Sequence, residues 1–452
     1  MIRLYLDKCV YSNIKSGKYN NLYDFLIQHQ NKIIVPYSTA TMLDLINYDH
    51  FNESAREKLL DEFPYILSIS KDHLLRFNEE SNRVECYKEE IQEYLTLENI
   101  DYKPHEEFLK DSCNDPDVMS FWKSITGVQQ NKETNIYDFL HQEESKEKSH
   151  LFDVFTKEGV KDKNALKLFR MSIPQKLQID VQDKSNWVIQ IENKLEKEGL
   201  NLNSVIVELL NLLGLKHNAM NRYKALYVAL DIFCGKNGEN KNSLDSILRD
   251  AEHSFYATHC DYFVSSDKGI IKKTGQISKR FNSMLHLYYL PSKETSIEEA
   301  VNKLTNDILA NITERNNPFF LADVSKLNLK KIEEGHYKGF ARINNFLNFF
   351  DTIYSDIIPE ESSFRYILRK DMGIARHFLF MTELDNVFEE LKHLSFEKYE
   401  DLEQLRKEFY QKKVNGFVFW ELEGIKFLVC VDPVEKHAII PQLIIFKNNN
   451  IA

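Results

Sequence analysis

The run from Asp250 to Asp267 constrains the fold of this chain more than any other feature. A helical pattern that carries Asp250 leads into a short apolar segment at residues 262–264, and Asp267 follows that segment closely. In open α/β sheets the carboxyl ends of the strands face a shared crevice, and ligands bind there. The run therefore predicts an α/β fold in which acidic residues gather at one edge of a parallel sheet.

Two acids far upstream occupy similar places. Asp7 ends the apolar segment at residues 2–6, and Asp44 follows the apolar segment at residues 33–35 within a helical pattern. Four carboxylates at one crevice would repel each other unless a cation lay among them. Carboxylate oxygens are the ligands that hard divalent cations prefer, which indicates a hard divalent metal. A centre of this kind is typical of metal-dependent phosphoryl transfer, and we expect hydrolysis of nucleic acid.

A single aspartate is more often a surface carboxylate or a helix cap than a metal ligand. Asp7, Asp250 and Asp267 are expected at strand and helix positions that converge on one crevice. That convergence favours a functional role for the set over three separate structural roles.

The chain divides into four parts by pattern. Residues 1–50 alternate strand-like and helical segments, and residues 203–292 resume this alternation. Residues 51–202 are strongly charged, poor in glycine and rich in helix formers, which predicts an all-helical insertion with helices at 83–94 and 187–195. Residues 293–452 are expected to form a separate α+β region that ends in an antiparallel meander of segments 416–421, 425–431 and 438–446.

Composition narrows the class of protein further. The chain has 452 residues, of which 43% are hydrophobic and 28% charged, as in ordinary folded proteins. No segment reaches the roughly 18 apolar residues of a membrane span, and the start lacks the pattern of a signal peptide, so we expect a cytoplasmic protein without membrane contact. The six cysteines form no C-x-x-C pair, which argues against a zinc ribbon or a disulfide framework. A formal charge of -11 argues against a surface that attracts nucleic acid everywhere, but it permits a local basic strip.

These segments resemble the PIN domain superfamily of metal-dependent nucleases. The family pattern L-D-x-N-V is matched at residues 6–10, with Cys9 in place of asparagine, and S-x-x-x-x-x-E is matched at 38–44, with aspartate in place of glutamate. A helical aspartate about seventeen residues before the acid of T-x-D is matched at 250–267, with Ser265 in place of threonine. The resemblance covers residues 1–50 and 203–291.

The resemblance implies a Mg²⁺- or Mn²⁺-dependent endoribonuclease with a PIN-like domain split by the insertion. Asp7, Asp250 and Asp267 would hold the metal, and Asp44 would complete the catalytic set. Three further residues are candidates for orienting the metal ligands or a water: Ser38, His253 and Ser266. The departures at Cys9 and Asp44 leave the role of Asp44 open.

Basic residues follow the last acid directly. We expect them to contact the phosphate backbone of RNA, with solvated helix lysines as the competing explanation. They are Lys268, Lys272, Lys273, Lys279 and Arg280.

Two alternatives stay open. Related folds cut DNA with the same chemistry, so a DNase or flap-type nuclease fits the same residues. The departures at Cys9 and Asp44 would also fit a catalytically degenerate interaction scaffold. The family's habits further suggest a toxin-like or antiviral effector, with a protein regulator bound through residues 51–202 or 293–452.

Overall fold

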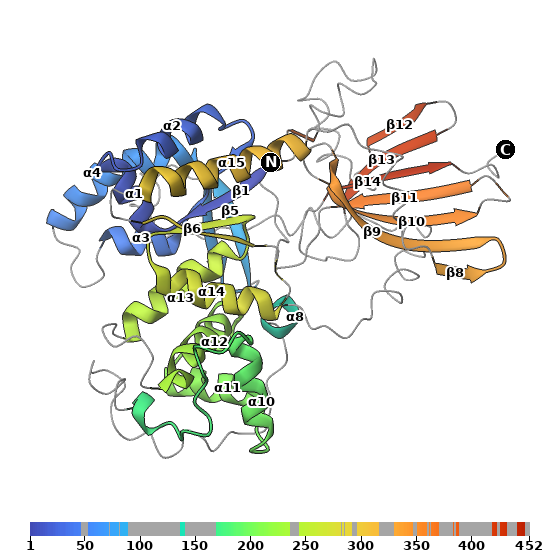
Figure 1. Ribbon diagram of the computed structural model, residues 1–452. Helices are drawn as coiled ribbons and strands as arrows, with labels where there is room; N and C mark the ends of the chain where they lie inside the picture. The colour runs from blue at the N-terminus through green and yellow to red at the C-terminus, as the bar shows by residue number, and fades with distance from the viewer. Residues whose placement is uncertain are drawn as a thin grey trace.

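A parallel sheet, a small mixed sheet and a large antiparallel sheet organise the molecule in a computed structural model (Figure 1). The structure describes residues 1–46, 53–88 without 72 and 81, 136–140, 169–235, 244–291 without 282 and 284, 296–315, 330–346, 350–369 without 359, 360 and 362, 383, 386–387, 418–422, 425–431 and 441–447.

The parallel sheet has four strands in the order β2-β1-β6-β7. They are β1 (Ile2–Leu6), β2 (Ile33–Ile34), β6 (Tyr262–Ser265) and β7 (His286–Tyr289). All three pairings are parallel, which confirms the expected α/β class with a parallel sheet. From β1 the chain continues to β2 on one side, whereas β6 and β7 lie on the other side. The strand order therefore reverses between β1 and β6, and ligands bind at such a point in open α/β sheets.

Alternate residues of β1 face opposite sides of the sheet. Ile2, Leu4 and Leu6 belong to one buried cluster, and Tyr5 belongs to the other. The first cluster includes residues of α1 (Lys8–Lys15), α2 (Asn20–Gln28), α4 (Glu53–Ser70) and α15 (Ile297–Arg315), which cover that face (Figure 1). Strands buried on both faces read as apolar runs, and this explains why residues 2–6 contain so few polar side chains.

Five helices build the buried cluster on the opposite face of the sheet. They are α10 (Trp187–Glu196), α11 (Leu202–Leu212), α12 (Ala219–Phe233), α13 (Leu244–Ala257) and α14 (Lys268–Arg280). Asparagine side chains cap the first three: Asn186, Asn201 and Asn218 each accept hydrogen bonds from amides of the first helical turn. The expected helix at 187–195 is confirmed. Helices therefore cover both faces of the sheet, with a separate buried cluster on each side.

The insertion is not all-helical. Within residues 51–202 the structure has β4 (His73–Asn78) and β5 (Arg83–Lys88), besides α4, α10 and the short α8 (Ile136–Leu140). β4 pairs with β5 in an antiparallel hairpin and with β3 (Tyr37–Ser38) in parallel, so the two strands belong to the fold of the first part.

The prediction of a helix at 83–94 is therefore wrong for residues 83–88. The segment pairs with β4 along its whole length, from Arg83 opposite Asn78 to Lys88 opposite His73. The charged residues of this segment look equally suited to an exposed helix, and only the pairing partners in β3 and β4 decide between the two. The rest of that segment, residues 89–94, lies outside the described residues.

The C-terminal sheet has seven antiparallel strands in the order β12-β13-β14-β11-β10-β9-β8 (Figure 1). The expected meander is confirmed as β12 (Val418–Leu422), β13 (Ile425–Val431) and β14 (Pro441–Lys447). Four strands that the sequence did not predict extend it: β8 (Lys330–Glu333), β9 (His336–Phe346), β10 (Phe350–Ile358) and β11 (Ser363–Arg369).

The expected boundary at residue 292 separates a helix from its own core. α15 begins after this boundary, yet Val301, Leu304 and Ile308 are buried in the same cluster as Leu4 of β1. The parallel-sheet unit therefore extends through α15. No helix in the described part of the chain is both long and apolar enough to cross a membrane.

A buried ion pair connects β1 to a residue of the C-terminal region. Arg3 donates from Nε and Nη2 to the two carboxylate oxygens of Glu383, at 3.0 and 2.5 Å. Both side chains are almost fully buried. Burial opposes the charge of Arg3, but the carboxylate of Glu383 outweighs that effect and raises the pKa of Arg3.

Candidate metal centre

The candidate centre lies where β1 and β6 end. Leu6 pairs with Val264 in the parallel ladder, and the amide of Asp7 donates to the carbonyl of Val264 at 3.0 Å. Asp7 therefore leaves β1 beside Ser265, the last residue of β6. α3 (Thr39–Ile46) and α13 bring further polar side chains to the same point.

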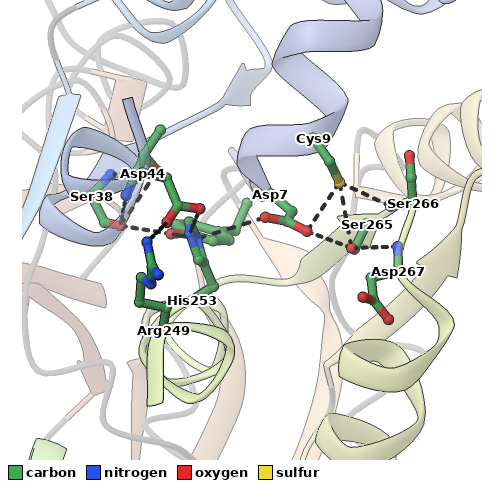
Figure 2. Close-up of polar contacts among 11 residues, drawn as sticks. Asp7, Cys9, Ser38, Asp44, Arg249, His253, Ser265, Ser266 and Asp267 are labelled. Atoms are coloured by element: carbon green, nitrogen blue, oxygen red, sulfur yellow. Dashed lines mark hydrogen bonds and ion pairs between the residues drawn. The ribbon is translucent and has the colours of Figure 1, made fainter. Parts of the chain in front are cut away.

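Three side chains from three elements meet there: Asp7 after β1, Asp44 of α3 and His253 of α13 (Figure 2). His253 Nε2 lies 3.1 Å from Asp44 Oδ2, and His253 Nδ1 lies 3.9 Å from Asp7 Oδ1. One ligand atom from each residue lies within 4.8 Å of the other two. The histidine thus bridges the two carboxylates.

Asp7 occupies the N-cap position of α1 but makes no capping hydrogen bond. Its Oδ2 instead accepts hydrogen bonds from Ser265 Oγ at 2.5 Å and from Cys9 Sγ at 3.1 Å (Figure 2). Burial, together with the charge of Asp7, raises the pKa of the Cys9 thiol, so the thiol keeps its proton and donates. Aspartate at an N-cap commonly bonds the first-turn amides. Here the carboxylate is turned towards His253, with only 8% of the residue exposed.

His253 is held from both ring nitrogens. Nδ1 lies 2.9 Å from the hydroxyl of Tyr5, which lies 2.6 Å from Ser38 Oγ. Tyr5, Ser38 and His253 are all buried. Ser38 therefore reaches His253 through the hydroxyl of Tyr5, and its orienting role stays a prediction.

His253 and Asp44 shift each other's pKa in the directions expected for an ion pair. Burial lowers the pKa of His253, but the hydrogen bond to Asp44 and the charges of Asp7, Asp44 and Asp250 raise it to about 9. Burial raises the pKa of Asp44, but His253, Arg249 and Lys8 outweigh it, so the pKa of Asp44 is lowered. At neutral pH the protonated imidazole therefore balances charge between two carboxylates.

The other two expected metal ligands lie outside this trio. Asp267 is exposed, and its Oδ1 accepts from the amides of Gly269 and Ile270 at 2.5 and 3.3 Å, which makes it the N-cap of α14. Figure 2 draws no contact between its carboxylate and Asp7. Asp250 lies one turn before His253 on α13, is partly exposed, and acts on the histidine through its charge.

Ser266 lies behind the site. Its hydroxyl is 3.0 Å from the hydroxyl of Tyr19 and accepts from Asn13 Nδ2 at 3.3 Å. Its amide donates to Cys9 Sγ at 3.3 Å, so its contact with the centre runs through the cysteine. Ser265 is the serine that reaches Asp7, and its place at the last position of the strand before the acid was the signal available in the sequence.

The five predicted basic residues divide into two groups. Lys268, Lys272 and Lys279 are exposed on α14. Lys273 is 4% exposed, and its Nζ lies 3.2 Å from Asp231 Oδ1, so its prediction as a surface contact is wrong. Arg280 makes two hydrogen bonds to Glu192, which offset its charge.

Two cations that the sequence did not single out flank the acids. Arg249 Nη1 lies 4.0 Å from Asp44 Oδ1, while its Nη2 pairs with Asp245 at 2.7 Å. Lys8 follows Asp7 on α1 and lies 3.7 Å from Glu62, and its charge also acts on Asp44. Arg249 is one helical turn before His253, which was the only sequence signal for its place.

The trio fits a divalent metal in donor type and approximately in size. Two carboxylate oxygens and an imidazole nitrogen are ordinary ligands of first-row divalent ions. Donors on opposite sides of an ion at about 2.1 Å are about 4.2 Å apart, which is comparable to the limit of 4.8 Å within which the three ligand atoms lie. Metal binding at His253 would require its proton to leave. Comparisons with family models, curated proteins and solved structures found no match for this chain.

Proposed function

We propose that this chain is a metal-dependent phosphodiesterase with a PIN-like centre, most suited to cutting RNA internally. One observation carries the proposal: Asp7, Asp44 and His253, from three elements, offer ligand atoms within 4.8 Å at the point where the sheet order reverses. A position at the carboxyl ends of parallel strands is where open α/β sheets bind their ligands.

The side chains around the trio have complementary tasks in this proposal. A divalent ion held by Asp7, Asp44 and His253 would polarise a phosphoryl oxygen and lower the pKa of a bound water. Ser265 and Cys9 keep the Asp7 carboxylate aimed at the centre by donating to its Oδ2. Arg249 is a cation at the edge of the acids, suited to attract a phosphate.

The donor set favours Mn²⁺ over Mg²⁺. Mg²⁺ takes oxygen ligands and keeps much of its water, whereas an imidazole nitrogen suits later first-row ions better. Asp250 and Asp267 remain candidate acids at the rim, since Asp250 lies on the same helix as His253 and Asp267 begins the helix beside Ser265. DNA stays an alternative substrate because the chemistry at the phosphate is the same.

A second candidate function has its own observation. The protonated His253 already balances the charge of Asp7 and Asp44 without any metal. A trio whose charges balance without a metal fits a protein that has lost catalysis and acts as an interaction scaffold.

Cleavage of labelled oligonucleotides separates these candidates. Purified protein would be incubated with single-stranded RNA or DNA in Mn²⁺, Mg²⁺ or EDTA, beside Asp7→Asn and the matched control Asp24→Asn, which changes an exposed acid of α2. We expect internal cuts in RNA with Mn²⁺ that are lost in EDTA and in Asp7→Asn but kept in Asp24→Asn. Absence of cleavage of either substrate with either metal would favour the scaffold.

A further inference from the structure

Three lysines form one row along α14. Lys268, Lys272 and Lys279 are separated by four and seven residues, and at about 100° per residue all three fall within about 40° of one helical face. All three side chains are exposed. The row spans about 16 Å at about 1.5 Å per residue. We call these three residues the lysine row.

Aromatic rings support two members of the lysine row. Lys268 Nζ lies 4.9 Å from the centroid of the Tyr289 ring, and Lys272 Nζ lies 4.5 Å from that of Trp187. A cation over a ring is held in place without losing its charge to a carboxylate. In the described part of the chain, no ion pair involves Lys268, Lys272 or Lys279, in contrast to Lys273 and Arg280.

The lysine row begins beside the candidate centre. Lys268 follows Asp267, whose amide donates to Ser265 Oγ at 3.0 Å, and Ser265 donates in turn to Asp7 at 2.5 Å. A polyanion bound along α14 would therefore reach the edge of the trio. In a chain of formal charge -11, a row of positive charges that leads to this edge is a local exception.

We propose that the lysine row binds the phosphate backbone of a single nucleic-acid strand and leads it to the centre. This inference rests on the proposed function for the identity of the ligand. A single row on one helix suits one strand, whereas a duplex presents two backbones. Tyr289 is partly exposed beside Lys268 and offers a ring face on which a base can stack.

Loss of three phosphate contacts has a measurable signature. For single strands, log K falls with log salt with a slope of about 0.7 per neutralised phosphate. The variant Lys268→Gln/Lys272→Gln/Lys279→Gln should therefore flatten the slope by about 2 and weaken binding at least about tenfold at moderate salt. Tyr289→Ala should weaken binding but keep the slope, because it removes stacking and no charge.

The experiment is fluorescence anisotropy of a labelled single-stranded RNA with the full chain in EDTA across a salt series, so that no metal-dependent cleavage interferes. The matched control is Lys18→Gln/Lys32→Gln/Lys303→Gln, which removes the same charge from three exposed lysines outside α14. Melting curves of both triple variants establish that they fold.

Flattening of the slope in the α14 variant alone supports the proposal. An unchanged slope, or equal flattening in the control, overturns it, and so does a duplex that binds as tightly as the single strand and loses as much in the variant. Failure of the proposed function gives a different result: wild-type protein would bind RNA through the row yet cut neither RNA nor DNA in Mn²⁺.

Discussion

His253 Nε2 lies 3.1 Å from Asp44 Oδ2, although the two residues are 209 positions apart in the chain. The contact joins α13 to α3 beside the ends of β1 and β6. Asp7 approaches the same ring from the other side, at 3.9 Å from Nδ1. When protonated, His253 is a cation between the two carboxylates. The trio can therefore be tested by metal binding, by the pH dependence of stability and by mutation.

Metal affinity should depend on the trio. Asp44→Asn and His253→Gln each replace a ligand group by a neutral amide of similar volume, which is a weaker ligand for Mn²⁺. We expect each to weaken Mn²⁺ binding by at least about tenfold, as loss even of groups that support a ligand does. Isothermal titration calorimetry of the purified chain measures this. Asp24→Asn, an exposed acid of α2, should bind as wild type does. Equal affinity in all four proteins would remove Asp44 and His253 from the centre.

Stability in EDTA should fall at alkaline pH because of His253. Its folded pKa of about 9 lies above the usual 6.5, so the protonated form stabilises the folded state. The contribution, on the order of 3 kcal/mol, is fully present below pH 6.5 and is lost as pH rises through about 9.

Urea unfolding of the wild type and of His253→Gln at a series of pH values measures the contribution of His253 to the free energy of unfolding. The difference in the free energy of unfolding should shrink across that window. The control variant is His217→Gln, which removes an exposed histidine that lies outside the candidate centre. A wild-type profile parallel to that of His253→Gln would contradict the ion pair.

Substitutions of Asp267 distinguish a role as the helix cap of α14 from a role as a metal ligand. Asparagine also caps helices well, whereas alanine does not, so Asp267→Asn should keep the stability of the wild type and Asp267→Ala should lose about 1 kcal/mol. If the capping role seen in the structure is its only one, both variants keep Mn²⁺ affinity and cleavage. Loss of Mn²⁺ binding in both would restore Asp267 to the set of metal ligands.

The buried pair of Arg3 and Glu383 should be costly to break. Glu383→Ala leaves the guanidinium of Arg3 buried without its main partner, and we expect a loss of about 3–5 kcal/mol in the free energy of unfolding. The double variant Arg3→Met/Glu383→Leu should recover much of that loss, because no buried charge remains. Glu192→Ala, which breaks the more exposed pair with Arg280, should cost at most about 1 kcal/mol. Urea unfolding that gives equal losses for Glu383→Ala and Glu192→Ala would contradict a tight, desolvated pair.

Local pattern was enough for the framework of the molecule. Apolar runs at residues 2–6 and 262–264 predicted strands of a parallel sheet, and the structure confirms them as parallel neighbours. The last three strands followed from alternating apolar runs between turn residues. β4 and β5 were missed because the charged residues of β5 suit an exposed helix equally well, and because the pairing of β4 with β3 and of β5 with β4 does not follow from the local sequence pattern.

The sequence by itself determined that acids end β1 and β6, since strand and turn patterns are local. Only the tertiary structure decided what each acid does. Asp7 and Asp267 both precede a helix after a strand, yet Ser265 and Cys9 hold the first towards His253, whereas the second bonds the amides of its own helix. Lys273 was likewise indistinguishable from Lys272 until the fold buried it against Asp231, on a helix far earlier in the chain. The physical reason is common to both cases: a side chain's role depends on partners that only long-range packing brings within hydrogen-bond distance.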